Sequence, residues 1–353
     1  MMRIIGRPRA LVGVVAGALL LAGCGSGPSQ VGAAAVIGDR SISIDQVQDL
    51  ITKAVREQPY AQKLAAEHKL DLVGRAVVSQ LVLHELITKA AEKQGVTPNY
   101  AQIDAQLAKD PLTGPVPADA SNETQAVSQV VARTRDHREE LTDTFLAQAL
   151  ADKTVPNASV TFDYTSVGLV PDATTGSSVE GPAAKTAAFD LAKQFAADPA
   201  ATKRIGADVQ YLAALRQRAT QMGQSAESIP PFASVGEAVP AAQASALAAG
   251  PLFGSPVGST VVFPFPNNQG AWFVGVIRQR TDKPVATEQA PDLDAATKTA
   301  AGIRQAQPLF DELGVRINKR YGVWDVVAMT VVPNEDAAQG IVLSPGGSGR
   351  TQQ

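Results

Sequence analysis

Histidine and cysteine side chains carry much of the acid–base, nucleophilic and metal chemistry of proteins at neutral pH, and this chain has few of either. It contains 3 histidines, His68, His84 and His137, and 1 cysteine, Cys24. A single cysteine excludes an intramolecular disulfide and a cysteine-based metal site. Leucines surround His84, and no Cys, His or Asp stands four residues before or after it. We therefore expect a packed histidine there and no metal ligand.

The carboxylates and the common catalytic motifs also give no sign of an enzyme. Glu57, Glu67 and Asp71 have no partner at a spacing that indicates paired acid–base groups. The chain has no Gly-x-Ser-x-Gly nucleophile motif and no glycine-rich phosphate loop. We expect the charge run at 135–140 to be the solvated face of a helix, with contact to a charged client as the alternative. The sequence thus predicts no catalytic residue, no metal and no cofactor.

Cys24 stands in a pattern that is typical of an exported protein. Arg3, Arg7 and Arg9 precede an apolar run over 10–22, which is too short to span a bilayer. The run ends in Leu-Ala-Gly before Cys24, which is similar to the bacterial lipobox, whose cysteine is acylated on sulfur and becomes the first residue. The alternatives are a cleaved secretory signal with a chance cysteine and a short buried helix.

From this pattern we predict a lipoprotein. Residues 1–23 would be the signal peptide, and residues 24–32 would form a flexible tether because Gly, Ser and Pro are frequent in them. Acyl chains on Cys24 would hold the protein on the extracytoplasmic face of the cell membrane. The formal net charge of −3 over 353 residues shows no basic excess, so we expect no nucleic acid partner.

Helical spacing dominates residues 33–155. A short strand at 33–38 is followed by Ser43 and Gln46, which fit a capping box at the start of a helix. A second helical pattern runs from about 64 to 94 and is apolar around much of its circumference. Such a helix is buried on several sides or lines a groove that other polypeptides fill. The candidate client-binding residues on it are Val78, Leu81, Val82 and Leu86.

Residues 156–285 change to a mixed pattern and read as an inserted α+β domain. Strand-like alternation at 160–167 precedes a helical pattern at 183–197, and two further strands are expected at 257–263 and 271–277. If exposed, the aromatic residues in and directly after the last two strands would form a second client-binding patch; ordinary core packing is the alternative. These candidates are Phe263, Phe265 and Trp272.

Residues 286–332 return to a helical pattern, with a break at Pro308, and then to a strand-like segment. Because the first and last strands flank the other elements, we predict that they pair. Residues 333–353 are polar and rich in Gly and Ser, so we expect a disordered tail. The predicted fold class is α+β: a mainly helical N-terminal module closed by the C-terminal segment, with a small α+β domain inserted in it.

Three segments resemble SurA- and PrsA-like foldases. The opening at 34–47 runs from small residues through a Gly-Asp turn into Ile-Ser-Ile-Asp-Gln, and Gly-Val-Thr-Pro at 95–98 resembles a recurrent helix start of that family. The segment at 315–325 resembles the closing part of actinobacterial lipoproteins with a SurA-type N-terminal domain. The resemblance implies a chaperone module that binds unfolded polypeptides.

In that family a parvulin prolyl isomerase domain often lies where the insert lies here, and residues 249–276 resemble the last third of a parvulin. The resemblance implies a site with a pair of histidines and a Cys or Asp. All three histidines of this chain precede the insert, and Asp163, near the first strand, does not restore the pair. The insert is therefore interpreted as a degenerate parvulin-like domain without catalytic residues, or as an unrelated α+β domain.

Together these features predict a lipid-anchored extracytoplasmic chaperone, or foldase-like protein, that binds unfolded or newly exported polypeptides without catalysis. Two alternatives follow from the same residues. One is an active peptidyl-prolyl cis-trans isomerase, and the other is an envelope scaffold lipoprotein with one specific partner. The sequence leaves the client and the oligomeric state open.

Overall fold

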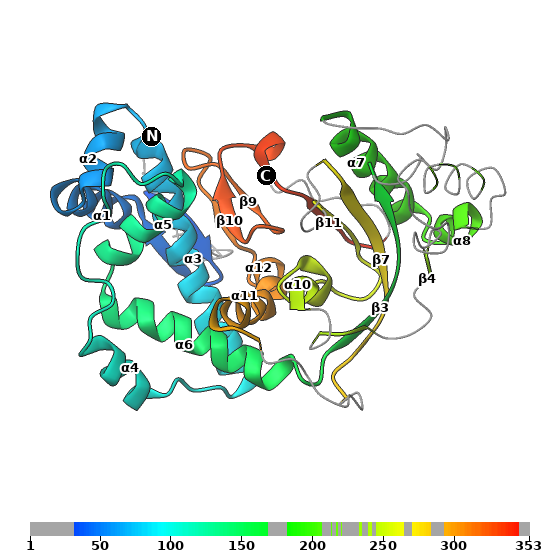
Figure 1. The fold of residues 1–353 in the computed structure, drawn as a ribbon, viewed down its shortest axis with the longest axis horizontal. Coiled ribbons are helices and arrows are strands. Elements are labelled where there is room, and N and C mark those ends of the chain that lie inside the picture. The colour runs from blue at the N-terminus through cyan, green and yellow to red at the C-terminus, as the bar shows by residue number, and fades with distance from the viewer. Residues whose placement is uncertain are drawn as a thin grey trace, which may run out of the picture.

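The structure, a computed structural model, has the predicted α+β fold class. It describes residues 32–168, 182–206, 233–234, 239–241, 245–264, 270–283 and 293–345, with the single positions 213, 217 and 220. The predicted signal peptide, Cys24 and Phe265 lie outside these residues. Figure 1 shows a helical part and a part built on a β-sheet, with the C-terminal elements between them. Within the described part, no helix has both the length and the hydropathy to cross a membrane.

The helical part consists of a strand hairpin followed by helices. Its elements are β1 (Ala33–Ile37), β2 (Arg40–Ser43), α1 (Ile44–Glu57), α2 (Pro59–Ala66), α3 (Leu70–Gln94), α4 (Tyr100–Leu107), α5 (Glu123–Thr134) and α6 (His137–Thr154). Ser43 caps α1 as predicted, because its hydroxyl accepts a hydrogen bond from the Gln46 N–H at 3.0 Å. Gly95 ends α3 in the left-handed conformation, with φ 62°.

The helical pattern predicted over 64–94 forms two helices. His68 has φ 57°, a conformation that breaks an α-helix, and α3 begins two residues later. α3 then passes through the centre of the helical part and contacts α1, α5, α6 and strand β10 (Thr330–Val332). Helices and strands therefore cover α3 on several sides, which is one of the two arrangements that its apolar circumference predicted.

The C-terminal segment closes this helical core. Its elements are α11 (Ala295–Gln305), α12 (Gln307–Glu312), β8 (Arg316–Ile317), β9 (Val323–Asp325) and β10. β8 pairs antiparallel with β1, with Ile317 opposite Ala35, so the predicted pairing of the first and last strands is confirmed. The predicted helix break lies at Ala306, between α11 and α12. Ser79 on α3 accepts a hydrogen bond from the Val331 N–H at 2.8 Å, which joins β10 to the core.

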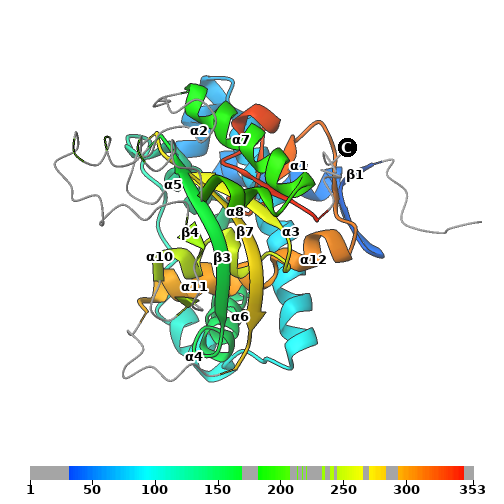
Figure 2. The same cartoon turned by 90° about the vertical axis from the view of Figure 1, so that its right-hand side faces the viewer.

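The insert contains the large antiparallel sheet. Its elements are β3 (Ser159–Val167), α7 (Pro182–Ala197), α8 (Ala201–Gly206), β4 (Ala233–Ser234), β5 (Val239–Pro240), α10 (Ser245–Ala248), the 3₁₀ turn η1 (Pro251–Phe253), β6 (Thr260–Pro264) and β7 (Trp272–Thr281). The strand order is β11-β6-β7-β3-β4, and β5 also pairs with β3. In Figure 2, β3 and β7 run side by side, and α7 crosses above them.

Two apolar clusters, one on each face, hold the sheet in place. On one face, Phe195 and other residues of α7 pack against Val262 and Val274. On the other face, Phe162 and Phe263 pack with η1 and with Ala301 of α11. The second cluster joins the insert to the helical part, because α11 also packs closely against α6.

The expectation of a disordered tail from residue 333 is wrong for the described residues up to 345. A 3₁₀ turn, η2 (Glu335–Ala337), leads into strand β11 (Ile341–Leu343), which pairs antiparallel with β6. The physical reason is the Ile-Val-Leu sequence, three apolar residues that favour a strand within a polar segment. Residues 346–353 lie outside the described part of the chain.

Candidate functional site

The apolar residues of α3 that the sequence suggested for client binding are core residues in this structure. Val78, Val82 and Leu86 are fully buried, and Leu81 is 7 % exposed. They belong to the main hydrophobic cluster with residues of α1, α5 and the C-terminal segment. The expected open groove along α3 is therefore absent from this conformation, and contact between these residues and a client stays a prediction.

The aromatic candidates of the insert divide between core and surface. Phe263 is 5 % exposed and stacks on Phe273 with ring centroids 4.6 Å apart, so it is a core residue. Trp272 is only half-buried and meets Phe189 of α7 edge to face, with ring centroids 5.8 Å apart. Trp272 thus supports the surface helix that forms the wall described next.

A groove of about 810 Å³ lies at the junction of the insert and the C-terminal segment. One wall is the outer face of α7, with Lys185, Phe189 and Lys193 one helical turn apart. The opposite wall includes Val323 and Val326 in and after β9. Strand β11 lines the groove between these walls, and η2 lies at its rim. In Figure 1, β11 runs between the β9–β10 hairpin and the strands below α7.

Lys185 fixes the position of α7 relative to the segment that precedes β11. Its Nζ donates hydrogen bonds to the carbonyl oxygens of Asp336 at 2.6 Å and Ala338 at 2.8 Å. The same ammonium lies over the Phe189 ring at 5.4 Å and the Trp272 ring at 5.9 Å. The wall of the groove is therefore held by contacts between residues far apart in the sequence.

β11 itself is seated closely on β6. A methyl group at Gly340, directly before the strand, would overlap the carbonyl oxygen of Val262. Only a residue without Cβ lets the chain enter the sheet at this point. The groove depends on this contact, because β11 lines it.

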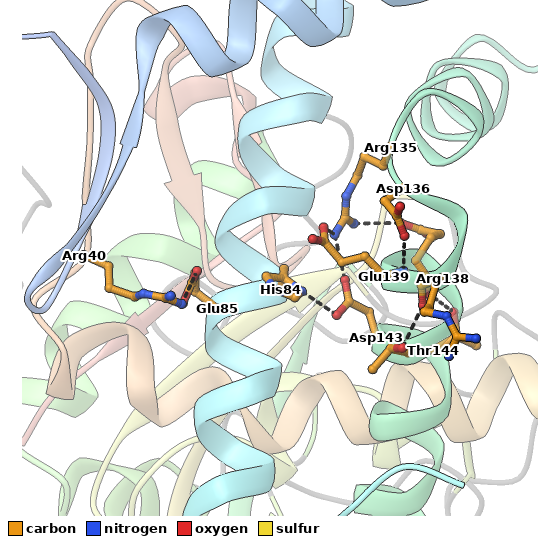
Figure 3. Close-up of polar contacts among 11 residues, drawn as sticks. Arg40, His84, Glu85, Arg135, Asp136, Arg138, Glu139, Asp143 and Thr144 are labelled. Atoms are coloured by element: carbon orange, nitrogen blue, oxygen red, sulfur yellow. Dashed lines mark hydrogen bonds and ion pairs between the residues drawn. The ribbon is translucent and has the colours of Figure 1, made fainter. Parts of the chain in front are cut away.

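A cluster of charged residues joins α3 to α6, where the sequence suggested a solvated helix face. Arg135, 4 % exposed, bonds through its guanidinium to Glu139, to Glu140 at 2.7 Å and to Asp143 at 2.9 Å. His84 Nδ1 on α3 donates to Asp143 at 2.7 Å, as Figure 3 shows. The expectation of a solvated face is therefore wrong for Arg135, which is buried among these carboxylates, whereas Asp136 and Arg138 of the same run are exposed.

The environment of this cluster changes the acidity of its members. The hydrogen bond to Asp143 raises the pKa of His84 above its usual value, against the effect of burial. Burial raises the pKa of Glu140, although Arg135 opposes this shift. Burial would lower the pKa of Arg135, but the surrounding carboxylates outweigh it and raise that pKa.

His84, Glu139 and Asp143 are the only group of at least three His, Cys, Asp or Glu residues, within the described ranges, whose oxygen and nitrogen atoms lie close enough to hold a metal ion. Arg135, however, already bonds to both carboxylates and supplies the positive charge that they require. The arrangement is therefore an ion-pair cluster in which a guanidinium takes the place of a metal ion. The partner of His84 was not visible to spacing rules, because Asp143 lies 59 residues away on another helix.

Asp163 is the residue of the insert that was considered as the acidic group of a parvulin-like site, and it is held in a structural ion pair. It is 2 % exposed and accepts hydrogen bonds from Arg278 Nε at 2.7 Å and from Thr202 Oγ1 at 2.9 Å. A carboxylate that is buried and fixed by two donors on neighbouring elements contributes to the packing of α8 on the sheet. This geometry gives Asp163 no access to a substrate.

Sequence reasoning placed the client surface on α3 and the hairpin and missed the groove beside β11. The missed lining residues are Phe189, Val326, Ile341, Val342 and Leu343. One signal was present, since Ile-Val-Leu at 341–343 is a short β-favouring run in an otherwise polar segment. The position of this run beside α7 depends on tertiary structure.

Comparison with known proteins gives one match. Residues 8–152 match the family model described as the SurA-like N-terminal domain. This range includes the helical part from β1 into α6 and stops before the insert. A search of curated proteins and a search of solved structures found no match.

Proposed function

Because this chain belongs to the SurA/PrsA-like foldases through its SurA-like N-terminal domain, we propose that it is a lipid-anchored extracytoplasmic chaperone. It binds unfolded or newly exported polypeptides near the membrane and does so without catalysis. The observation that carries the proposal is the match of residues 8–152 to a domain of a chaperone family. The groove between α7, β9 and β11 supports it, since it offers partly exposed apolar side chains outside the packed core.

The membrane anchor rests on the N-terminal sequence. Arginines precede a short apolar run, and small residues precede Cys24, as in a lipoprotein signal. Two or more acyl chains on that cysteine give stable membrane attachment, whereas one chain gives only marginal binding. A Cys24→Ala variant expressed in a bacterium is expected to leave the membrane fraction and to lose incorporation of labelled palmitate. Retention of label by the variant would contradict the anchor.

The absence of catalysis is proposed from the residues of the insert. None of the three histidines lies in residues 156–285, and Asp163 is engaged by Arg278 and Thr202. A proline-limited refolding assay tests this part. We expect the refolding rate to be unchanged by the protein at equimolar amounts. A dose-dependent acceleration would favour the isomerase alternative.

Suppression of aggregation tests the chaperone function itself. A chemically denatured reporter protein is diluted into buffer with the purified chain carrying Cys24→Ser, and light scattering is followed. We expect scattering to fall as the molar ratio of chain to reporter rises. An unrelated globular protein at equal mass concentration serves as the control. Unchanged scattering, with one stoichiometric partner recovered from a crosslinked pull-down, would favour the scaffold alternative.

A further inference from the structure

Within the part of the chain that the structure describes, β11 is an edge strand with one unpaired side. It lies outermost in the sheet, beside β6. The N–H and C=O groups of successive strand residues point alternately to the two sides, so part of those on β11 point away from β6. In the described ranges, no backbone hydrogen bond joins that outer side to another segment. An edge of this kind pairs with another extended backbone.

The groove borders this edge and does not lie over one face of the sheet. Ile341, Val342 and Leu343 all line it, although successive side chains of a strand point to opposite faces. Ile341 and Leu343 pack with the cluster under α7, and Val342 packs with the cluster on the other face. A space that contacts three successive strand residues lies beside their backbone. An extended segment in the groove therefore lies within reach of the β11 backbone.

The walls define what the side chains of such a segment meet. On the α7 side they meet Phe189, and on the other side they meet Val323 and Val326. Val323 and Val326 make one wall apolar, and on the α7 wall Phe189 is an apolar side chain between Lys185 and Lys193, so an entering strand gains from apolar side chains that contact these three residues. The groove volume of about 810 Å³ lies within the range of roughly 300–1,000 Å³ that is usual for ligand sites.

The charges at the rim favour a basic residue next to the apolar segment. Lys185 is engaged by two carbonyl oxygens, and Lys193 pairs with Asp190 at 2.9 Å. Glu335 and Asp336 of η2 are exposed, and neither carboxylate has an ion pair with any residue that the structure describes. Lys185 and Lys193 together face three carboxylates in the lining, those of Asp190, Glu335 and Asp336, so the formal charge of the groove is 2 − 3 = −1 and attracts Lys or Arg.

We propose that β11 binds an extended apolar polypeptide segment flanked by Lys or Arg, and that the segment joins the sheet as an additional strand. The proposal rests on the proposed chaperone function and specifies the form in which a client is held. Strand addition takes its affinity from main-chain hydrogen bonds, which every sequence offers. A site of this type tolerates many clients, and the apolar side chains of the groove with its acidic rim select among them.

Backbone methylation tests strand addition directly. The probe is a labelled peptide, Lys-Val-Thr-Val-Ile-Val-Thr, with blocked ends, and binding to the full chain carrying Cys24→Ser is measured by fluorescence anisotropy. Two derivatives carry N-methyl groups, one on the second, fourth and sixth residues and the other on the third, fifth and seventh. Only one edge of the peptide pairs with β11, so one derivative should bind about tenfold or more weaker while the other retains binding. Equal affinities of the two derivatives would overturn the proposal.

Protein variants locate the site. Phe189→Ala removes apolar area from the α7 wall, and Glu335→Lys reverses a rim charge; both should weaken peptide binding several-fold, the second less in high salt. Asp119→Lys is the matched control, because Asp119 is exposed and does not line the groove. Amide hydrogen exchange at residues 341–343 should slow when the peptide binds. Unchanged exchange there, or equal weakening by the control, would contradict binding at β11.

The remaining outcomes separate this inference from the chaperone function. If the chain suppresses aggregation but both methylated peptides bind like the parent peptide, strand addition is wrong and the chaperone function stands. If neither reporter protein nor peptide binds, both proposals fail. Peptide binding that appears only after deletion of residues 346–353 would identify the end of this chain as the occupant and overturn the proposal.

Discussion

Replacement of Arg304 by methionine is expected to uncouple the insert from the helical part. Arg304 is 5 % exposed, and its guanidinium donates to backbone carbonyl oxygens of both regions. Nε bonds to Ala249 of the insert at 3.0 Å, and Nη1 and Nη2 bond to Val326 and Val327 of the C-terminal segment at 2.8 and 2.7 Å. Nη1 also donates to Gln307 Oε1 at 2.8 Å. The variant keeps side-chain volume but removes every one of these donors.

The magnitude follows from these bonds and from the cost of the buried charge. Hydrogen bonds that involve a charged group contribute about 1.5–3 kcal/mol each. In the variant the carbonyl oxygens remain buried, and no water replaces the guanidinium as their donor. Burial lowers the pKa of Arg304 to about 10, which corresponds to an offsetting cost of roughly 3 kcal/mol for the charged form. The free energy of unfolding of Arg304→Met should therefore fall by about 3 kcal/mol or more.

The 2 tryptophans make the uncoupling measurable. Trp272 reports on the insert, and Trp324 reports on the C-terminal segment, where it stacks on Phe310 at 5.0 Å. Urea unfolding of Trp272→Phe and Trp324→Phe forms should give coincident midpoints with Arg304 present and separate midpoints with Arg304→Met.

The exposed Arg56, which pairs only with its neighbour Glu57 among the described residues, provides the control Arg56→Met. It should change the midpoint little. A loss below about 1 kcal/mol for Arg304→Met, with coincident midpoints, would refute the reasoning.

Three further predictions concern other contacts. Gly302→Val should lower the melting temperature of the protein by several degrees, because any Cβ on Gly302 would overlap the Ala147 carbonyl of α6 and separate α11 from it; an unchanged melting temperature would contradict this. Gly340→Ala should weaken peptide binding while the helical part keeps its stability, because a Cβ at this position prevents β11 from pairing with β6. Fluorescence anisotropy measures the peptide binding, and circular dichroism measures the stability. The pKa of His84 is raised by its bond to Asp143, so that its contribution to stability is complete below the unfolded pKa of about 6.5 and is lost as the pH rises through the folded value. His84→Gln should therefore be most destabilising near pH 6 and least at pH 9; a pH-independent difference would exclude the linkage.

Local chemistry made the N-terminal half readable from the sequence. The Ser43 cap and the glycine that ends α3 each act within one helical turn, so residue type and spacing determine them. The pairing of β1 with β8 was also predicted. The two strands are the first and last elements of the helical part, and they can lie side by side because the insert forms a sheet of its own.

Residue spacing along the chain could not predict the buried polar contacts. His84, Arg135 and Asp143 lie on two sequence segments, and only the packing of α3 against α6 brings them together. The charge run was therefore assigned to solvent, although Arg135 is only 4 % exposed. The charge pattern along one segment predicts that the segment is helical, but it does not predict which face of the helix other elements cover.

The same limit applies to the client surface. Val78 and Val82 had the composition of an apolar groove, and so did Ile341 and Val342, but neighbouring elements bury the first pair and leave the second pair at an edge. The sequence by itself determined the α+β class, the start of α1, the end of α3 and the lipobox pattern, since these depend on residues close together in the chain. The tertiary structure alone decided which apolar residues face a groove and which charges are buried, because exposure depends on the neighbours that distant segments supply.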